Sequence, residues 1–551
     1  MKRRIKIFPI ILILILILGI VLGIFLLKNK KQEETIIENY LASNLPQVEL
    51  YDEEFNKVLE LPRGTKVITK NKIEKDEETY IKIKYEENTY LVKEKNINEE
   101  IVLEKEIFVR TPSVLYENSE DGKILSYLKK GEKLEIIGYD YLKDGNVNMY
   151  KVKGNAEGYA YAKYLNQDEA EANKYYDNGY YENHAKRTNV YGGGDAATLD
   201  YFPYVKPTFE DNVMPEEVNS LYINREAIKN IDAYIEYAKQ TKINAFVVDI
   251  KDNASPAYKS KVMEALSPTN YEHATLTLEE YKEQIKKIKD NGFYVIGRIT
   301  TFKDDYYAMD NKEDTIYDTR TNEPFKHNGS LWPSAYNRNV WYFNVELAKE
   351  AVSVMGFNEI QFDYVRFPDR TSSIEPYLDF KNIYNETKAQ AIQGFVMYAC
   401  DELHKLNVYV SIDVFAESAH QYVTGYGQYF PAISNIADVI SPMAYPDHYS
   451  KNEYGISEVV WTVPYKLIKV WAGYVNDRQK ETTTPAIVRT WIQTYNTIRE
   501  PYITYDSSKV SDQIQALYDS NLKNGFITWN SGSSLAKYKS LSEAFNKNYK
   551  E

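Results

Sequence analysis

Residues 359–368 read Glu-Ile-Gln-Phe-Asp-Tyr-Val-Arg-Phe-Pro, and this stretch decides the expected fold of the chain. It predicts a short strand over residues 359–364, with Asp363 at its carboxyl end and Arg366 shortly beyond it. An acidic residue directly after Phe362 at a strand end is difficult to explain as solvated surface. The stretch therefore predicts a functional site at the end of the strand, and an ion pair between Asp363 and Arg366 that only holds the loop is the alternative.

Further strand candidates lie on both sides of this one. They are residues 221–224, 245–250, 294–300, 409–414, 439–443, 486–489 and 525–529, and helical patterns intervene at 228–240, 278–291, 340–355, 385–406 and 511–523. Several of the strands are short and apolar on both faces, which is typical of parallel strands covered by helices. Eight βα units over residues 216–551 predict an α/β fold, a (β/α)₈ TIM barrel with enlarged loops. An open doubly wound sheet is the alternative, although no Gly-rich phosphate loop follows the first strand.

The carboxyl ends of these strands carry acidic, basic and aromatic residues, and in a TIM barrel these ends form the active site. The candidate catalytic residues are Asp363, Asp413 and Glu417. The candidate substrate-binding residues are Asp249, Lys251, Arg298, Arg366, Tyr445, His448, Arg489, Trp491 and Trp529. Cleavage of a glycosidic bond requires one protonated carboxyl and one ionised carboxylate at the bond, and aromatic faces stack on sugar rings. The strand ends therefore predict a sugar site.

Individual roles follow from position along the chain. We expect Arg366 to keep Asp363 ionised, and Glu417, packed against aromatic residues, to be the protonated acid. Arg298 and Arg489 are alternatively buried partners of the acids. Lys251 is alternatively a structural partner of Asp249, and Trp491 and Trp529 are alternatively packing residues.

Four segments of the barrel region resemble a family of bacterial glycosyl hydrolase domains that was long catalogued as a domain of unknown function. The segments are residues 244–252, 359–368, 413–415 and 440–446, and the resemblance covers about 216–535. It implies a TIM barrel, an extracellular or wall-associated glycosidase, and acidic site positions at Asp249, Asp363 and Asp413. Glu417 does not clearly belong to the family pattern, so its predicted role rests on position alone. Chitinase-like barrels are also similar, but Val365 stands where their catalytic Glu would be. In α-amylase-like barrels the acids of strands four and five correspond better to Asp363 and Glu417.

Residues 7–27 form an uncharged apolar run that would span roughly 31 Å as a helix, the thickness of a hydrocarbon core. Four basic residues lie within residues 1–6, so the positive-inside rule leaves this tail in the cytoplasm. We therefore expect a single-pass transmembrane helix in the cell membrane, with the catalytic domain outside the cell. A cleaved signal peptide is the alternative, but the run lacks a small-residue cleavage site.

The segments between the membrane helix and the barrel predict two small β modules. Residues 28–45 have the composition of a stalk, and residues 46–98 and 104–166 repeat a pattern of short alternating strands around Gly64 and Gly131. Both modules resemble bacterial SH3-like domains, which implies cell-wall binding, and a pair of spacers without a ligand is the alternative. Residues 167–215 are rich in Tyr, Asn and Gly, and we expect them to be a linker that packs over the barrel.

Composition limits the remaining possibilities. The chain has 551 residues, 43% hydrophobic and 27% charged, which is ordinary for globular domains. Its single cysteine, Cys400, excludes an internal disulfide and a multi-cysteine zinc site. The net charge is −13 although residues 1–31 contain seven basic and no acidic residues, so the body is acidic and a poor match for nucleic acid.

Taken together, the sequence predicts a membrane-anchored glycoside hydrolase that acts on a cell-wall or extracellular polysaccharide, or on a peptidoglycan-type glycan. We expect no cofactor and no metal. Two alternatives remain open. One is a non-catalytic protein that binds cell-wall glycan through a degenerate barrel, and the other is a metal-dependent carbohydrate esterase.

Overall fold

The computed structural model describes residues 37–42, 47–76, 78–98, 106–142, 147–176 and 191–550. The expected cytoplasmic tail, the membrane helix at 7–27 and most of the stalk lie outside these residues. Within the described ranges, no helix combines the length and the hydropathy that a membrane crossing needs. The chain divides into two compact units, residues 1–107 with 133–163, and residues 108–132 with 164–551.

The N-terminal region is all-β, as the alternating patterns predict. One seven-stranded sheet has the order β3-β2-β6-β5-β4-β1-β7, and its strands are β1 (Ile37–Leu41), β2 (Gln47–Tyr51), β3 (Lys57–Pro62), β4 (Lys66–Lys75), β5 (Glu78–Tyr85), β6 (Asn88–Lys93) and β7 (Ile97–Asn98). β1 falls inside the expected stalk yet pairs with β4 and β7, so the first module includes residues that composition alone assigns to a spacer.

A second seven-stranded sheet repeats this topology strand for strand, in the order β10-β9-β13-β12-β11-β8-β14. Its strands are β8 (Glu106–Val109), β9 (Ser113–Tyr116), β10 (Ile124–Leu128), β11 (Lys133–Tyr141), β12 (Val147–Lys153), β13 (Glu157–Tyr161) and β14 (Leu165–Asn166). Gly64 and Gly131 both have a positive φ, at 87° and 79°, directly before the corresponding strands β4 and β11. Glycine adopts this conformation without steric cost, which explains why the two repeats share it.

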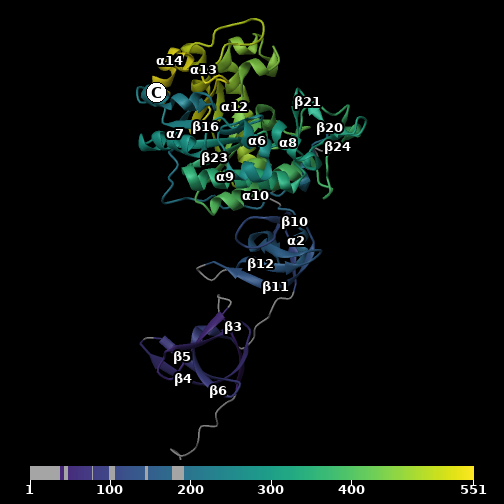
Figure 1. The fold of residues 1–551 in the computed structure, drawn as a ribbon, viewed down its shortest axis with the longest axis vertical. Helices are drawn as coiled ribbons and strands as arrows, with labels where there is room; N and C mark the ends of the chain where they lie inside the picture. Colours follow the sequence, from purple (N-terminus) through teal and green to yellow (C-terminus); the bar gives the residue numbers. More distant parts are fainter. Residues whose placement is uncertain are drawn as a thin grey trace, which may run out of the picture. The chain divides into compact units, whose positions relative to one another are not determined.

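The C-terminal region, coloured teal to yellow in Figure 1, contains a closed barrel of eight parallel strands. The strands are β15 (Val218–Ile223), β16 (Ala245–Asp252), β18 (Tyr294–Thr300), β23 (Glu359–Asp363), β25 (Tyr409–Phe415), β26 (Val439–Met443), β28 (Thr490–Gln493) and β29 (Gly525–Trp529). β15 pairs in parallel with both β16 and β29, which closes the ring. The barrel prediction is therefore confirmed, and the open-sheet alternative is wrong.

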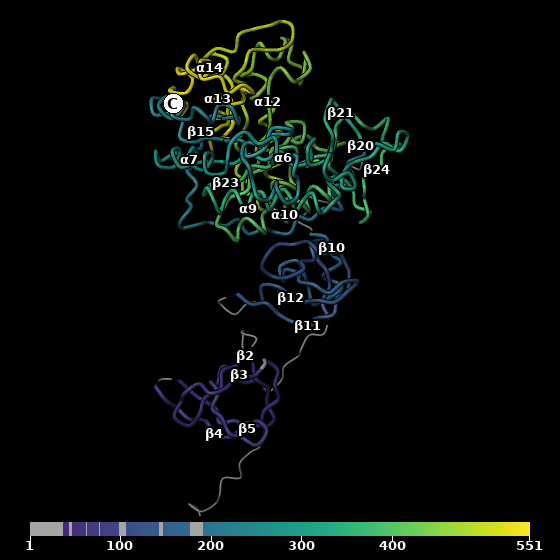
Figure 2. Tube along the Cα trace, viewed as in Figure 1, coloured from purple at the N-terminus to yellow at the C-terminus, as the bar shows by residue number. Residues whose placement is uncertain are grey.

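The helices that cover the barrel include the five that the periodicity predicts, and the order of elements can be followed by colour in Figure 2. These five are α4 (Ile231–Ala238), α7 (Leu278–Asp290), α9 (Arg338–Met355), α10 (Lys388–His404) and α13 (Ser507–Tyr518). A further long helix, α12 (Pro464–Glu481), begins at a proline, which is favourable at the first helical position. Shorter helices are α2 (Glu169–Asn173), α5 (Lys261–Leu266), α6 (Pro268–His273), α8 (Asp305–Asp310), α11 (Phe430–Ser434), α14 (Leu535–Ser540) and α15 (Ser542–Asn546).

The loops at the carboxyl ends of the strands are long. The connection from β18 to α9 contains α8 and the short strands β19 (Tyr317–Asp318), β20 (Glu323–Pro324), β21 (Lys326–His327) and β22 (Ser330–Leu331). Minor strands elsewhere are β17 (Ser255–Pro256), β24 (Leu378–Asp379) and β27 (Ile487–Val488). Long loops at this end of a barrel leave room to build a ligand cavity above the strands.

Candidate functional site

A cavity of about 1160 Å³ opens over the carboxyl ends of the barrel strands. Its lining includes residues that immediately follow several different strands. Of the predicted site residues, it includes Asp363, Glu417, Arg298, Arg366, Tyr445, His448, Trp491 and Trp529. The volume lies slightly above the usual range of small-molecule sites, roughly 300–1,000 Å³. The cavity is thus large enough for more than a single sugar ring.

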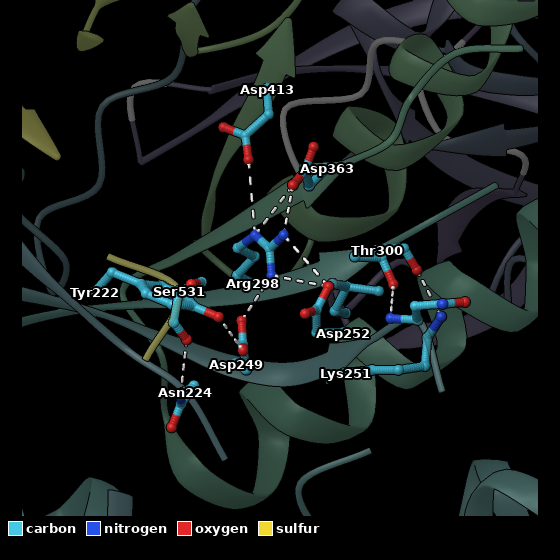
Figure 3. A network of polar contacts seen from close by, with 12 residues as sticks. Tyr222, Asn224, Asp249, Lys251, Asp252, Arg298, Thr300, Asp363, Asp413 and Ser531 are labelled. Atoms are coloured by element: carbon cyan, nitrogen blue, oxygen red, sulfur yellow. Dashed lines mark hydrogen bonds and ion pairs between the residues drawn. The ribbon is translucent and has the colours of Figure 1, made fainter. Parts of the chain in front are cut away.

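Arg298, at the end of β18, is the centre of the charged network in this cavity (Figure 3). Its Nη1 donates to Asp249 Oδ1 at 2.8 Å, and its Nη2 and Nε donate to Asp363 Oδ2 at 2.5 and 3.2 Å. Asp252 Oδ1 lies 3.4 Å from Nη1, and Asp413 Oδ2 lies 4.0 Å from Nε. Burial lowers the pKa of Arg298, but the charges of the neighbouring aspartates outweigh this effect and raise it above the ordinary value. The guanidinium is therefore a permanent positive charge among four carboxyl groups.

A β-bulge explains how two acids three residues apart on one strand face the same guanidinium. Alternation along β16 directs Asp249 into the barrel, and the register with β18 then shifts by one residue between Asp249 and Lys251. The extra residue directs Asp252 inward and Lys251 outward. Lys251 accordingly lies among the helices, where it bonds to Asp304 at 2.7 Å and is fully buried.

Asp249 is buried beneath the cavity. Its Oδ2 accepts a hydrogen bond from the Tyr222 hydroxyl at 2.5 Å, and its main-chain carbonyl accepts one from Tyr281. Burial raises the pKa of Asp249 to about 7, with the charge of Asp252 adding to the effect and Arg298 opposing it. Asp249 therefore changes its charge near neutral pH.

Asp413 is 0% exposed and is not among the described residues that line the cavity. Its Oδ1 accepts a hydrogen bond from the Trp491 indole at 2.7 Å, while Oδ2 has no hydrogen-bond partner among the described residues. Burial, together with the charge of Asp363, raises the pKa of Asp413 well above its ordinary value. An uncompensated charge would be costly here, so the protonated form is favoured.

Asp363 reaches the cavity, and both of its carboxylate oxygens are engaged. Oδ1 accepts from the Tyr364 backbone N–H at 2.6 Å, and Oδ2 accepts from Arg298. Tyr364 has φ 52°, a left-handed conformation that costs a non-glycine residue on the order of 1–3 kcal/mol. Such a cost beside a cavity-lining carboxylate is typical of a functional site. The cation that holds Asp363 is thus Arg298, and the expectation for Arg366 is wrong, because Arg366 instead bonds to Asp369 at 3.1 Å.

Aromatic rings form the floor and one wall of the cavity. Trp529 is partly exposed and packs edge-on against Trp491, with ring centroids 5.6 Å apart. Tyr445 is nearly parallel to Trp529 at 6.3 Å and contacts His448 at 5.2 Å. Trp491 is 1% exposed, whereas Trp529, which also lines the cavity, is partly exposed.

Glu417 is exposed at the cavity wall rather than tucked against Phe415 and Tyr445 as expected. Its two oxygens accept hydrogen bonds from the Tyr422 and Tyr426 hydroxyls at 3.0 and 2.9 Å. The burial on which its expected role as a protonated acid depends is therefore absent.

Arg489 lies inside the barrel, below the cavity. It precedes Trp491 by two residues, so alternation places it on the same interior face, one layer deeper. Its Nη1 donates to both oxygens of Glu359 at 2.7 and 2.9 Å, and both side chains are fully buried. Arg489 is thus the buried partner of an acid, the alternative that the sequence left open. Lys251 is also the buried partner of an acid, but this acid is Asp304 and not Asp249 as expected. Neither residue lines the cavity.

Several lining residues were not among the predicted candidates, notably Asp252, Tyr191, Tyr422 and Tyr426. Asp252 directly follows a strand and was visible as an acid, but only the bulge directs it inward. Tyr191 lies before the barrel, where no local pattern indicates a site. No group of three or more His, Cys, Asp or Glu side chains in the described ranges is placed to hold a metal ion.

Comparisons with solved structures found several matches of low similarity. A hypothetical protein from Ruminiclostridium thermocellum ATCC 27405 is 30% identical over 35% of this chain and 97% of its own, with a TM-score of 0.29. The PgaB (BpsB) glycoside hydrolase domain from Bordetella bronchiseptica is 11% identical over 60% of this chain and 99% of its own, with a TM-score of 0.44. A class V chitinase from Pseudomonas fluorescens Pf-5 is 11% identical over 59% of this chain and 99% of its own, with a TM-score of 0.38. Among curated proteins, none matches the chain.

The family comparison covers more than half of the chain. A model described as "Putative glycosyl hydrolase domain" matches residues 220–535, which begin in β15 and end after β29. This range contains most of β15, the other seven barrel strands, the Arg298 network and nearly every residue that lines the cavity. The chain therefore belongs, through its barrel, to this family of glycosyl hydrolase domains.

Proposed function

We propose that the protein hydrolyses a glycosidic bond in a polysaccharide, with Asp363 as the carboxylate that acts on the sugar carbon. One observation carries the proposal: Asp363 is a cavity-lining carboxylate that a buried arginine holds in place, next to a second accessible carboxyl, Asp252. Arg298 places its positive charge beside Asp363 and bonds to one of its oxygens, and a carboxylate is the group that acts as nucleophile or stabilises an oxocarbenium-like transition state.

Asp252 is the acid/base partner that we propose for Asp363. Its side chain is 37% exposed and lines the cavity, so it can reach a leaving oxygen. Asp252 Oδ1 and Asp363 Oδ2 contact the same Arg298 nitrogen, Nη2, at 3.5 and 2.5 Å. The two carboxyl groups therefore contact one guanidinium nitrogen, close enough to act on the same bond. We propose a retaining mechanism through a covalent glycosyl-enzyme intermediate.

Asp413 and Glu417 take different roles in this proposal. Asp413 is a neutral neighbour below Asp363, because its raised pKa keeps it protonated and its burial keeps it from the substrate. Glu417 is the alternative acid, since it is exposed at the cavity wall. An aryl glycoside, whose leaving group needs no protonation, distinguishes the two candidate acids experimentally. In the variant of the true acid, Asp252→Asn or Glu417→Gln, kcat/KM on this substrate stays close to wild type while activity on the polysaccharide is lost. The kcat on the aryl glycoside falls, because the same residue is the base that activates water against the glycosyl-enzyme.

The decisive experiment is sugar release by the full chain from a panel of cell-wall and extracellular polysaccharides. We expect Asp363→Asn to lower kcat/KM at least about 1,000-fold, while the chain stays folded and still binds glycan, because Arg298 retains Asp249 and Asp252 as partners. Wild-type activity in this variant would refute the assignment.

A non-catalytic glycan-binding protein is the second candidate. One observation favours it: two of the three acids that match the family pattern, Asp249 and Asp413, are buried below the cavity. Binding of glycans with no release of reducing ends, in the wild-type chain and at several pH values, would support this candidate over hydrolysis.

The cellular setting that we propose comes from the sequence. Residues 7–27 would anchor the chain, with the barrel outside the cell, and the two β modules would bind cell-wall glycan. Protease treatment of intact cells tests the orientation: the barrel should be digested while a tag at the N-terminus is protected.

A further inference from the structure

One residue of the cavity wall lies outside the family-matched barrel sequence. Tyr191 precedes residue 220, where the family match begins, yet it lines the cavity together with residues of the loop after β25. Its side chain is 52% exposed, and its ring centroid lies 4.6 Å from that of Tyr422. Tyr422 in turn donates to Glu417. Two adjacent tyrosine rings therefore stand at the wall, one of them from the segment that the sequence identifies as a linker.

The glycines that follow Tyr191 dock this segment onto the barrel. A Cβ atom on Gly193 would lie 1.8 Å from the Thr424 carbonyl oxygen, so only glycine permits the approach. The Gly193 carbonyl accepts a hydrogen bond from the Ala389 N–H, at the start of α10, at 2.9 Å. On the other side, a Cβ on Gly425 would lie 2.8 Å from the Tyr191 carbonyl oxygen. Gly192–Gly194 is thus a close backbone contact with the loop that carries Tyr422 and Glu417.

The next residues hold the segment in place through apolar packing. Leu199 and Tyr201 are buried in one cluster with Ala389, Val423 and Tyr429. The Tyr201 hydroxyl donates to the Ala196 carbonyl at 2.6 Å. The position of Tyr191 is therefore defined by packing on both α10 and the β25 loop, whereas its ring remains open to solvent.

We infer that Tyr191 and Tyr422 form a sugar-binding subsite at the wall of the cavity, beside Glu417, and that the protein acts on oligo- or polysaccharide chains rather than on short glycosides. Exposed aromatic faces bind the apolar faces of sugar rings while their hydroxyls bond to polar groups. The cavity volume of about 1160 Å³ leaves room for several sugar units. This inference rests on the proposed glycosidase function and specifies its substrate as a chain long enough to reach from Asp363 to Tyr191.

The test compares long and short substrates on the full chain. The probes are cello-, chito- and xylo-oligosaccharides and peptidoglycan glycan strands of two to eight sugar units, and an aryl glycoside of one unit. For Tyr191→Ala we expect KM to rise roughly three- to tenfold on the longest cleaved probe, with kcat on the aryl glycoside unchanged. Tyr191→Phe keeps the ring and should retain most of the affinity. Tyr175→Ala is the matched control, because Tyr175 is 51% exposed but does not line the cavity.

Gly193→Ala provides an independent variant, since it displaces the segment without altering the tyrosine ring. We expect it to raise KM for the long probe as Tyr191→Ala does. Equal KM values for wild type and both variants at every probe length would overturn the subsite. Binding of the same probes to Asp363→Asn chains, with and without Tyr191→Ala, separates the two proposals: a length-dependent loss of binding supports the subsite even when no probe is cleaved.

Discussion

Arg298 donates from two of its nitrogens to a single oxygen of Asp363, Oδ2, at 2.5 and 3.2 Å. The two residues lie on the adjacent strands β18 and β23, where Thr300 pairs with Asp363 in the parallel register. The long Arg298 side chain thus extends toward the carboxyl end of the barrel and contacts the last residue of the neighbouring strand β23. This geometry fixes the carboxylate before any substrate binds, which avoids the cost of ordering it during the reaction.

Removal of the guanidinium should destabilise the barrel. Arg298→Met leaves Asp249 and Asp363 without their cation, and the loss of one partner from a buried ion network typically costs about 3–5 kcal/mol. Arg298→Lys keeps the charge but has three donors on one nitrogen instead of the planar five-donor guanidinium, so we expect an intermediate loss. Urea unfolding at pH 7 measures both effects. A Met variant as stable as wild type would contradict the central role of this side chain.

The stability of the protein should depend on pH through Asp249. Its pKa is about 7 in the folded chain and 3.8 ordinarily, so its contribution to stability is complete below about pH 3.8 and disappears as the pH rises through 7. The asparagine of Asp249→Asn cannot ionise, so the variant does not lose this stability as the pH rises. Relative to wild type, the unfolding free energy of the variant should therefore increase by a few kcal/mol between pH 4 and 8. Urea unfolding across this range tests the expectation. Asp232→Asn, at an exposed acid, is the control that should show no such shift.

Lys251 should prove structural. Its Nζ bonds to Asp304 and to the Thr300 carbonyl, and both Lys251 and Asp304 are buried. Lys251→Met removes one partner of this pair and should cost about 3–5 kcal/mol of unfolding free energy, whereas KM for the glycan should stay within roughly twofold, a shift below 0.5 kcal/mol. The double variant Lys251→Met/Asp304→Asn should recover part of the stability. A selective rise in KM without a change in stability would return Lys251 to the substrate-binding residues.

Asp413 and Trp491 should respond differently to conservative replacement. Asp413→Asn substitutes a neutral group for a carboxyl whose raised pKa already keeps it neutral, so the unfolding free energy at pH 7 should change by less than about 1 kcal/mol. Trp491→Phe removes the indole donor to Asp413 and should cost about 1–3 kcal/mol. Calorimetry of both variants at pH 7 provides the comparison. A larger loss in Asp413→Asn than in Trp491→Phe would show that the carboxyl is charged in the folded chain.

The sequence predicted more of the barrel than of its side-chain partners. Strand positions depend on local patterns of apolar residues, so β18, β26 and β29 have the expected bounds. The acid at the end of β23 was identified for the same reason, because a strand end is a local feature. Pairing is not local: Arg366 lies three residues from Asp363, but Arg298, from another strand, is the residue that bonds to it.

The depth of a residue in the barrel and the register of its strand explain the other differences between the predicted and the observed side-chain positions. Arg489 and Trp491 alternate onto one interior face, yet only Trp491 lies high enough to reach the cavity. A single extra residue in β16 exchanges the expected directions of Lys251 and Asp252. Neither effect leaves a mark in hydrophobic periodicity, because both depend on how neighbouring strands align.

The amino-acid sequence alone therefore determined the family, the order of strands and helices, the closed barrel and the end of it that carries charge, since these follow from residue type and spacing along one chain. The tertiary structure decided which acids share Arg298, which of them reach solvent and that Tyr191 joins the cavity wall. The physical reason is that desolvation and charge pairing depend on distances between segments far apart in the chain, which local patterns do not contain.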